Sequence, residues 1–178
     1  MAAGVMSNQQ DGSMFTRIAL AAMLGGLISG TCLAADFDPL DQEQIGGLRY
    51  GLSEAAFKKE IACAPTRGPE EFAGADGAWH QDWKYPDCGI TLGTVSNKKR
   101  GVKTIESITV SRPSALATKK GIKIGSTKAA VVTAYKTHQN KELSQSSDGF
   151  AVGTAYALLM FDFADGRVSS IFLGVGAE

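Results

Sequence analysis

The segment 79–89, WHQDWKYPDCG, gathers residue types that can do chemistry. His80 and Asp82 are two positions apart, so on an extended strand both side chains lie on one face, where a carboxylate can orient an imidazole as a general base. Such a pair needs a nucleophile, and no serine of the chain lies in a G-x-S-x-G turn. A polar strand face in solvent explains the same pattern, so the catalytic hypothesis is kept only as an alternative.

The other side of the same strand is aromatic. Alternating aromatic residues pack against a helix in most sheets, but Trp and Tyr are also the commonest energetic anchors of protein interfaces. The sequence leaves open which of the two alternating sets lies on an exposed face. We therefore take both sets as candidate partner contacts: Trp79, His80, Asp82, Trp83, Lys84 and Tyr85.

Other polar residues need no chemical role. His138 follows a predicted helix and is expected to be solvated, and Asp165 belongs to a turn sequence, ADGR, that uses aspartate structurally. The acidic residues near the predicted mature N-terminus lack the glycine and spacing of a calcium loop. They are Asp36, Asp38, Asp41 and Glu43. We therefore predict no metal site and no cofactor.

The charge balance argues against nucleic acid as a partner. Lys and Arg total 18 and Asp and Glu total 18, so the formal net charge is +0. No overall basic field exists to steer a polyanion. The local run NKKRG (97–101) lies between two predicted strands and is interpreted as a solvated hairpin loop.

An export signal begins the chain. Residues 18–35 are apolar and uncharged and follow Arg17, which is the order of a secretory signal peptide. We predict cleavage after Ala34, so that 1–34 is the signal, and a true start at Met14. An uncleaved anchor helix and lipidation at Cys32 are the alternatives. Cleavage predicts a periplasmic or secreted protein without stable membrane insertion.

Two cysteines remain after the signal. Cys63 and Cys88 form an even pair in an exported chain, which favours one disulfide. Neither is part of a CxxC motif, and the histidines are not spaced with them as zinc ligands would be. A catalytic Cys–His pair with His80 would require one thiol to stay reduced in an oxidising compartment.

The sequence contains an internal repeat, in which one type of unit occurs twice. GLRYGLSEAAFKKEI (47–61) aligns with GIKIGSTKAAVVTAY (121–135), each with a short strand ending at a glycine and a helix capped by Ser53 or Thr127. Ala56, Phe57, Glu60 and Ile61, and likewise Ala130, Val131, Ala134 and Tyr135, give each helix an apolar stripe.

Three strands are predicted after each helix, at 78–85, 89–96 and 102–110 and at 150–156, 157–163 and 167–175. The last strand of each half spaces its apolar residues three apart, which predicts a β-bulge in both. We expect an α+β fold of two tandem helix-plus-antiparallel-sheet repeats, forming an extended or saddle-shaped sheet with helices on one face. The predicted boundaries are a flexible N-terminus (35–45), a first repeat (46–112), a linker (113–120) and a second repeat (121–178).

This tandem pattern resembles the beta-lactamase inhibitory protein fold, and each unit is similar to the small outer-membrane assembly lipoproteins. The resemblance rests on the paired glycines, Ser53 and Thr127, the two cysteines and the terminal DGRVSSI. The inhibitor family has a disulfide in each repeat, whereas the second repeat here has none. The resemblance implies a secreted, non-enzymatic protein whose concave sheet face grips a protein partner.

These expectations define three hypotheses about function. The leading one is an exported binding protein that docks on an unidentified protein through its exposed sheet face, as an inhibitor or an immunity-type blocker. The second is an envelope assembly or structural protein. The third is a hydrolase that uses His80 and Asp82.

Overall fold

The computed structural model describes residues 37–144 and 148–176. The chain divides into two units, Met1–Ala34 and Ala35–Glu178, and every described residue belongs to the second. The predicted signal peptide, with Met14, Cys32 and Ala34, lies outside the described residues.

Antiparallel strands dominate the described chain and its helices are short, which places it broadly in the α+β or mainly-β class. The helices are α1 (Pro39–Gln42), α2 (Glu54–Glu60) and α3 (Lys128–Tyr135), with 3-10 turns at Pro86–Cys88 and Lys136–His138. The strands are β1 (Thr66–Arg67), β2 (Glu71–Ala73), β3 (Ala78–Tyr85), β4 (Ile90–Ser96), β5 (Thr104–Ser111), β6 (Gln139–Asn140), β7 (Gly149–Thr154), β8 (Ala157–Ala164) and β9 (Arg167–Gly174).

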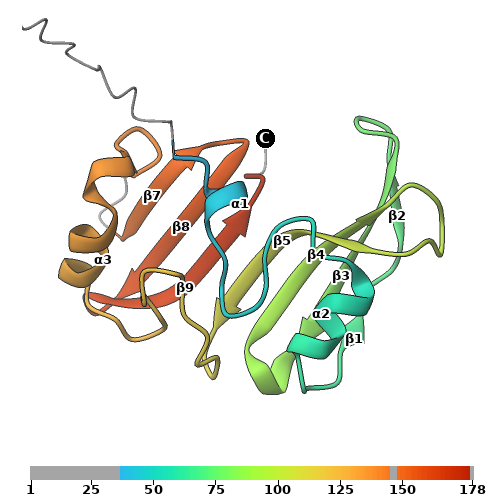
Figure 1. Cartoon of the computed structure of the whole chain (residues 1–178), viewed down its shortest axis with the longest axis horizontal. Coiled ribbons are helices and arrows are strands. Elements are labelled where there is room, and N and C mark those ends of the chain that lie inside the picture. Colours follow the sequence, from blue (N-terminus) through green and yellow to red (C-terminus); the bar gives the residue numbers. More distant parts are fainter. Residues whose placement is uncertain (1–36, 145–147, 177–178) are drawn as a thin grey trace, which may run out of the picture. The chain divides into compact units, whose positions relative to one another are not determined.

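All of these strands join one sheet in the order β1-β3-β4-β5-β9-β8-β7-β6, with β2 also paired to β3. Two meanders, β3–β5 and β7–β9, meet where β5 pairs antiparallel with β9. Helices α1, α2 and α3 lie over the same side of this sheet (Figure 1). None of the helices of the described residues covers the opposite side.

The core lies between the sheet and these helices. One row of cross-strand neighbours on β3, β4, β5, β9, β8 and β7 is at most 1% exposed. Its members are Trp83, Leu92, Ile108, Leu173, Leu159 and Val152. Phe57 of α2, Ile61 just after that helix, and Val131 and Tyr135 of α3 belong to the same cluster. The predicted stripes are therefore confirmed at these four positions, whereas Glu60 and Ala130 are exposed.

Both predicted bulges are present. The register of β4 with β5 shifts so that Glu106 has no opposite residue, and that of β8 with β9 shifts so that Ser169 has none. Ile105 and Ile108 thereby both reach the core. The ADGR turn is also confirmed, because Asp165 and Gly166 have φ of 53° and 69°, the backbone that a two-residue hairpin needs.

The short strands expected before each helix are not formed. Isolated bridges, Ser53↔Thr104 and Thr127↔Arg167, take their place, because the chain turns sharply at the preceding glycines. The expected helix caps also differ. Thr127 Oγ1 accepts the Ala130 N–H at 3.2 Å, whereas the Ser53 hydroxyl makes no capping bond. The prediction of a Ser53 cap was therefore wrong.

The segment 35–45 was expected to be a flexible terminus, and its described part is instead packed. Asp38 caps α1 by accepting the Leu40 N–H at 2.8 Å. Glu43 is 3% exposed and Ile45 is fully buried in the core. Apolar burial outweighs the entropy of ordering a terminus here, because α1 lies against β8 and β9.

The disulfide between Cys63 and Cys88 is formed, with a Cα–Cα distance of 6.1 Å. It joins the segment after α2 to the 3-10 turn that follows β3. The helix and the first long strand of the sheet are thus held together covalently.

Candidate functional site

The side of the sheet without helices is the candidate site, and we call it the open face. Residues directly opposite on neighbouring strands share a face. A row of such neighbours crosses from β3 to β8, and its side chains are exposed or half-buried. It consists of Lys84, Thr91, Thr109, Phe172 and Met160. Apart from the hydrophobic Phe172 and Met160, the row is small or polar, unlike the core row beside it.

The structure decides between the two alternating sets on β3. Trp83 and Tyr85 are 1% and 2% exposed and belong to the core, so neither is available to a partner. This corrects their assignment as partner contacts. Asp82 and Lys84 are exposed and His80 is half-buried on the open face, while Trp79 is half-buried on the helical side, beyond the core.

His80 is held by two carboxylates, and neither belongs to Asp82. Its Nδ1 lies 2.8 Å from Glu106 Oε1, and its Nε2 lies 2.9 Å from Asp76 Oδ2. Asp76 precedes β3 in the turn from β2, and Glu106 is the bulged residue of β5. The expected His80–Asp82 pair is therefore not formed. The imidazole instead ties a hairpin to a strand two positions away in the sheet.

This arrangement favours a charged imidazole. The hydrogen bond that His80 donates to Glu106 raises the pKa of His80 above its usual 6.5, Asp76 adds to the effect, and partial burial opposes it. The pKa of Asp76 is lowered, chiefly because its carboxylate accepts the Ala78 N–H and also binds His80. An imidazolium donating both protons satisfies both carboxylates. Such a group is poorly suited to accept a proton at neutral pH.

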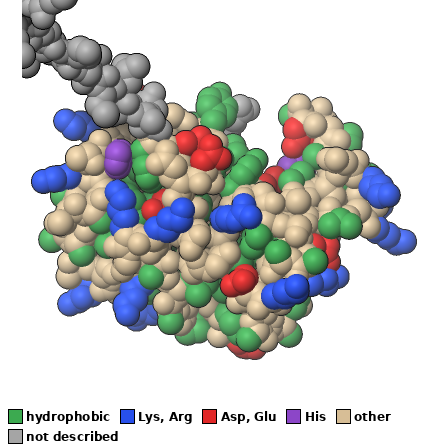
Figure 2. Space-filling view, in the orientation of Figure 1, with side chains coloured by type: hydrophobic (Ala, Val, Ile, Leu, Met, Phe, Trp, Pro, Cys, Tyr) green, Lys and Arg blue, Asp and Glu red, His purple; other side chains and the backbone are tan. Residues whose placement is uncertain are grey.

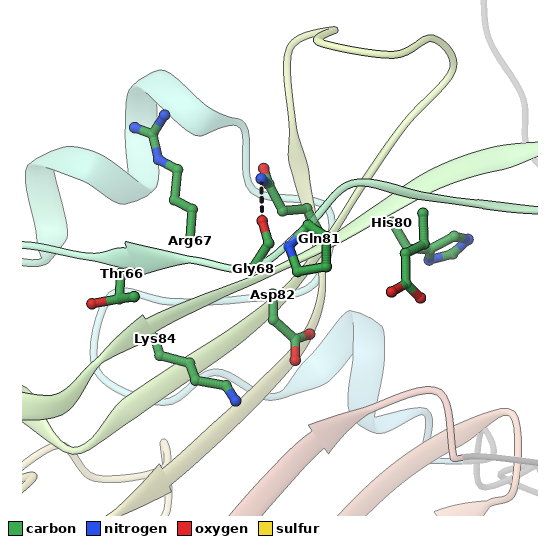
Figure 3. A pocket seen from close by; sticks show the side chains of 9 residues that line it. Thr66, Arg67, Gly68, His80, Gln81, Asp82 and Lys84 are labelled. Carbon is green, nitrogen blue, oxygen red and sulfur yellow. Dashed lines mark hydrogen bonds between the residues drawn. The ribbon is translucent and has the colours of Figure 1, made fainter.

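A cavity of about 320 Å³ lies beside His80 at the edge of the sheet, where β1 and β2 both pair with β3. It is lined by Thr66, Arg67, Gly68, Pro69, Glu71, His80, Gln81, Asp82 and Lys84. Asp82 and Lys84 extend to one side of the strand, whereas Arg67 and Gln81 extend to the other (Figure 3). The cavity thus wraps the strand edge and presents both charge signs.

The helical side of this edge is built around Trp83. Its Nε1–H donates to Gln81 Oε1 at 2.9 Å, and Gln81 Nε2–H donates to the Gly68 carbonyl at 2.9 Å. The Arg67 guanidinium lies 3.9 Å from the Trp83 ring centroid, a cation–π contact. These contacts fix the register of β1 on β3, and with it the open-face side chains.

Two glycines clear space on the open face. A Cβ at Gly93 would lie 2.3 Å from Ser107 Oγ, and one at Gly174 would lie 2.6 Å from Ser107 Cβ. The Gly93 position also faces Glu106, whose Cγ would be 3.4 Å from such a Cβ. The missing side chain at Gly93 therefore lets the Glu106 carboxylate cross β4 toward His80.

Two further polar residues lie on other elements. His138 stacks on Phe37 with ring centroids 4.4 Å apart. Burial raises the pKa of Asp162, which lies on β8. In the described part of the chain, no three His, Cys, Asp or Glu side chains gather as metal ligands do.

Sequence reasoning missed Asp76 and Glu106. Asp76 could have been found, since it begins an Asp-Gly turn four residues before His80. Glu106 carried no such signal, because its position depends on the bulge and on the pairing of β4 with β5.

Comparisons with known families, curated proteins and solved structures give no match to this chain. Within residues 37–144 and 148–176, no helix is long and apolar enough to cross a membrane.

Proposed function

We propose that this chain is an exported, non-enzymatic binding protein that docks on another protein through the open face, as an inhibitor or an immunity-type blocker. The observation that supports it most is the open face itself. It spans strands of both meanders, lacks a helical layer, and mixes small polar residues with Phe172 and Met160. A standard interface buries about 800 Å² per partner, which requires a broad surface such as a sheet face rather than a cavity at the sheet edge.

Rigidity of the face supports the same function. The disulfide, the Trp83 contacts and the His80 bridge each fix β3 relative to its neighbours. A face that is ordered before binding loses less conformational entropy on association. The bridge from His80 to Asp76 and Glu106 also places charged groups at one point of the face. Such charges contribute more to the choice of partner than to affinity.

We also propose that the two halves arose from one duplicated unit. Gly51 N–H donates to the Ile105 carbonyl, and Gly125 N–H donates to the Val168 carbonyl, each at 2.8 Å. The bonds Ile105 N–H to Leu52 O and Val168 N–H to Ser126 O match in the same way. Equivalent bonds at positions that align in sequence support a tandem repeat, and with it the resemblance to the inhibitor fold.

Export is proposed from the N-terminal sequence and from the disulfide, a bond typical of oxidising compartments. We infer a periplasmic or secreted location. Epitope-tagged protein recovered in the periplasmic or extracellular fraction, with residues 1–34 removed, is the expected result. Retention of the intact N-terminus in the cytosol would contradict it.

The test of the binding function uses one matched pair of variants. Thr109→Lys places a long charged side chain in the middle of the open face, and Thr133→Lys adds the same side chain to the exposed surface of α3. We expect wild type and Thr133→Lys to capture one saturable protein from envelope and periplasmic extracts, and Thr109→Lys to lose it. Equal capture by both variants, or no saturable partner, would refute the proposal. Equal melting temperatures of the two variants exclude unfolding as the cause.

A further inference from the structure

A second exposed surface lies on the helical side of the sheet. It is at the end where the β2–β3 and β4–β5 hairpins lie. Phe72 on β2 is 57% exposed, and its ring centroid lies 5.5 Å from that of Trp79 on β3. The turn between β4 and β5 brings Lys99 Nζ to 5.1 Å from the Trp79 ring. Lys98 and Arg100 are exposed in the same turn. We call these five residues the tip cluster.

The carboxylates near the tip cluster neutralise only part of its positive charge. Glu70 accepts the Arg100 backbone N–H at 3.0 and 3.1 Å and pairs with buried Lys103 Nζ at 2.6 Å. The charge of Glu70 is balanced chiefly by Lys103, and Lys99 has a smaller effect in lowering the pKa of Glu70. Glu71 is the cross-strand neighbour of His80, whereas Phe72 is the neighbour of Trp79. Because side chains alternate along a strand, Glu71 extends to the opposite face from Phe72.

Positive charge is therefore concentrated in this turn, although the formal net charge of the whole chain is +0. Lys98, Lys99 and Arg100 lie together in the β4–β5 turn, and other basic side chains are spread over the face that Figure 2 shows. Two aromatic rings lie beside this turn, and Val102, which follows the turn, is 75% exposed. The backbone beneath is fixed by the Glu70 contacts and by the Gly101 N–H, which donates to the Lys98 carbonyl at 2.9 Å.

We propose that the tip cluster docks on the surface of a membrane that contains anionic phospholipid. The chemistry of the five residues supports this occupant. Trp and Lys have apolar bodies and polar ends and are favoured at the lipid–water interface. Clustered Lys and Arg are attracted to anionic headgroups. Two rings and three cations at a projecting turn are too few for a standard protein interface but suit peripheral contact with a bilayer. This inference goes beyond the proposed function, because the tip cluster and the open face are on opposite sides of the sheet.

The test measures co-sedimentation of the protein with vesicles. One set is pure phosphatidylcholine, and the other contains phosphatidylcholine with phosphatidylglycerol at a ratio of roughly 3:2. We expect binding to the anionic vesicles only, and loss of binding in high salt. The variant Lys98→Gln/Lys99→Gln/Arg100→Gln should bind about 100-fold more weakly, since each basic residue near the surface is worth about fivefold. Phe72→Ser should also weaken binding without changing the net charge.

The matched control is Lys59→Gln/Lys136→Gln/Lys141→Gln, which removes the same charge from exposed positions elsewhere. It should retain most of the binding. Trp79 supplies an independent signal, because the other tryptophan, Trp83, is buried. Vesicle binding should shift its emission to shorter wavelength. Thr109→Lys should bind vesicles normally, which separates this proposal from the open-face one.

Three results would overturn the proposal. They are no binding to anionic vesicles, equal binding to both vesicle types, and equal losses in the tip and control variants. Binding of the tip cluster to polyglutamate or to duplex DNA, without binding to vesicles, would also overturn it and would assign the cluster to an acidic macromolecule instead.

Discussion

The imidazole of His80 on β3 lies 2.8 Å from the carboxylate of Glu106 on β5, and strand β4 runs between them. Gly93 leaves room for this contact, and the bulge at Glu106 turns its side chain toward it. A residue that is central to the candidate site is thus positioned by backbone irregularities on two other strands.

This contact predicts that the stability of the fold depends on pH. In the folded protein, Glu106 and Asp76 raise the pKa of His80 above its unfolded value near 6.5. The stabilisation is therefore complete below about pH 6.5 and is lost as pH rises through the raised pKa. One proton limits the slope to about 1.4 kcal/mol per pH unit. Urea unfolding from pH 5 to 9 measures it.

Two variants isolate the contribution of His80. His80→Gln should flatten the curve in this pH range. Glu106→Gln should lower the pKa of His80, measured by NMR titration of the ring protons, more than Asp76→Asn does, because Glu106 is the larger cause. A larger effect of Asp76→Asn would show that the turn carboxylate controls the imidazole instead.

Glu43 predicts a second pH dependence in the acidic range. Burial raises its pKa above the usual 4.5, although hydrogen bonds from the Lys119 and Gln44 backbone oppose the effect. Because the pKa of Glu43 is raised by folding, its contribution to stability is fully present below about pH 4.5. This contribution decreases as the carboxyl ionises at higher pH. Glu43→Gln keeps an acceptor for the Lys119 N–H and removes the charge. Relative to wild type, this variant should gain stability between pH 4 and 7 in thermal unfolding.

Glu43→Ala is the matched control, since it removes the acceptor as well as the charge. It should be less stable than wild type at every pH. A Glu43→Gln variant that is destabilised at neutral pH would show that the ionised carboxylate stabilises the N-terminal segment.

Local patterns in the sequence were enough to predict the two meanders, their bulges and the Asp165–Gly166 turn. These features follow from residue alternation and from turn chemistry within about ten residues. The ordered segment that contains Glu43 and Ile45 could not be predicted, because its polar residues are satisfied by partners that are distant in sequence, such as Lys119.

The same distinction applies to the site. Alternation on β3 separated Trp83 and Tyr85 from His80 and Lys84, but it could not tell which set faces the helices. That choice depends on where α2 packs. The partners of His80 depend on strand order, which no local pattern encodes.

The disulfide predicts a large loss of stability when it is removed. The two cysteines are 25 residues apart, and the chain-entropy model gives about 3 to 4 kcal/mol for a loop of that length. Cys63→Ala/Cys88→Ala should therefore unfold at much lower denaturant concentration. Dithiothreitol should weaken wild type toward the variant and leave the variant unchanged. A sensitivity of the double variant to reductant would contradict this account.

The environment of Tyr85 predicts that removing its hydroxyl group does not destabilise the fold. Its side chain is buried, and its Oη has no hydrogen-bond partner among the described residues. An unsatisfied buried hydroxyl costs roughly 1–3 kcal/mol. Tyr85→Phe should therefore leave stability unchanged or raise it by about 1 kcal/mol. Tyr135→Phe is the contrast, since Tyr135 Oη donates to Thr118 Oγ1 at 2.8 Å in the core.

The Tyr135 variant should lose about 1 kcal/mol or more, because its hydroxyl bonds Thr118 and also interacts with the Glu43 carboxylate. Chemical denaturation of the two variants beside wild type measures both effects. Because each substitution removes one oxygen from a buried ring, differences in packing largely cancel. A loss of equal size at Tyr85 would mean that its hydroxyl is satisfied in solution, and that this part of the core admits water.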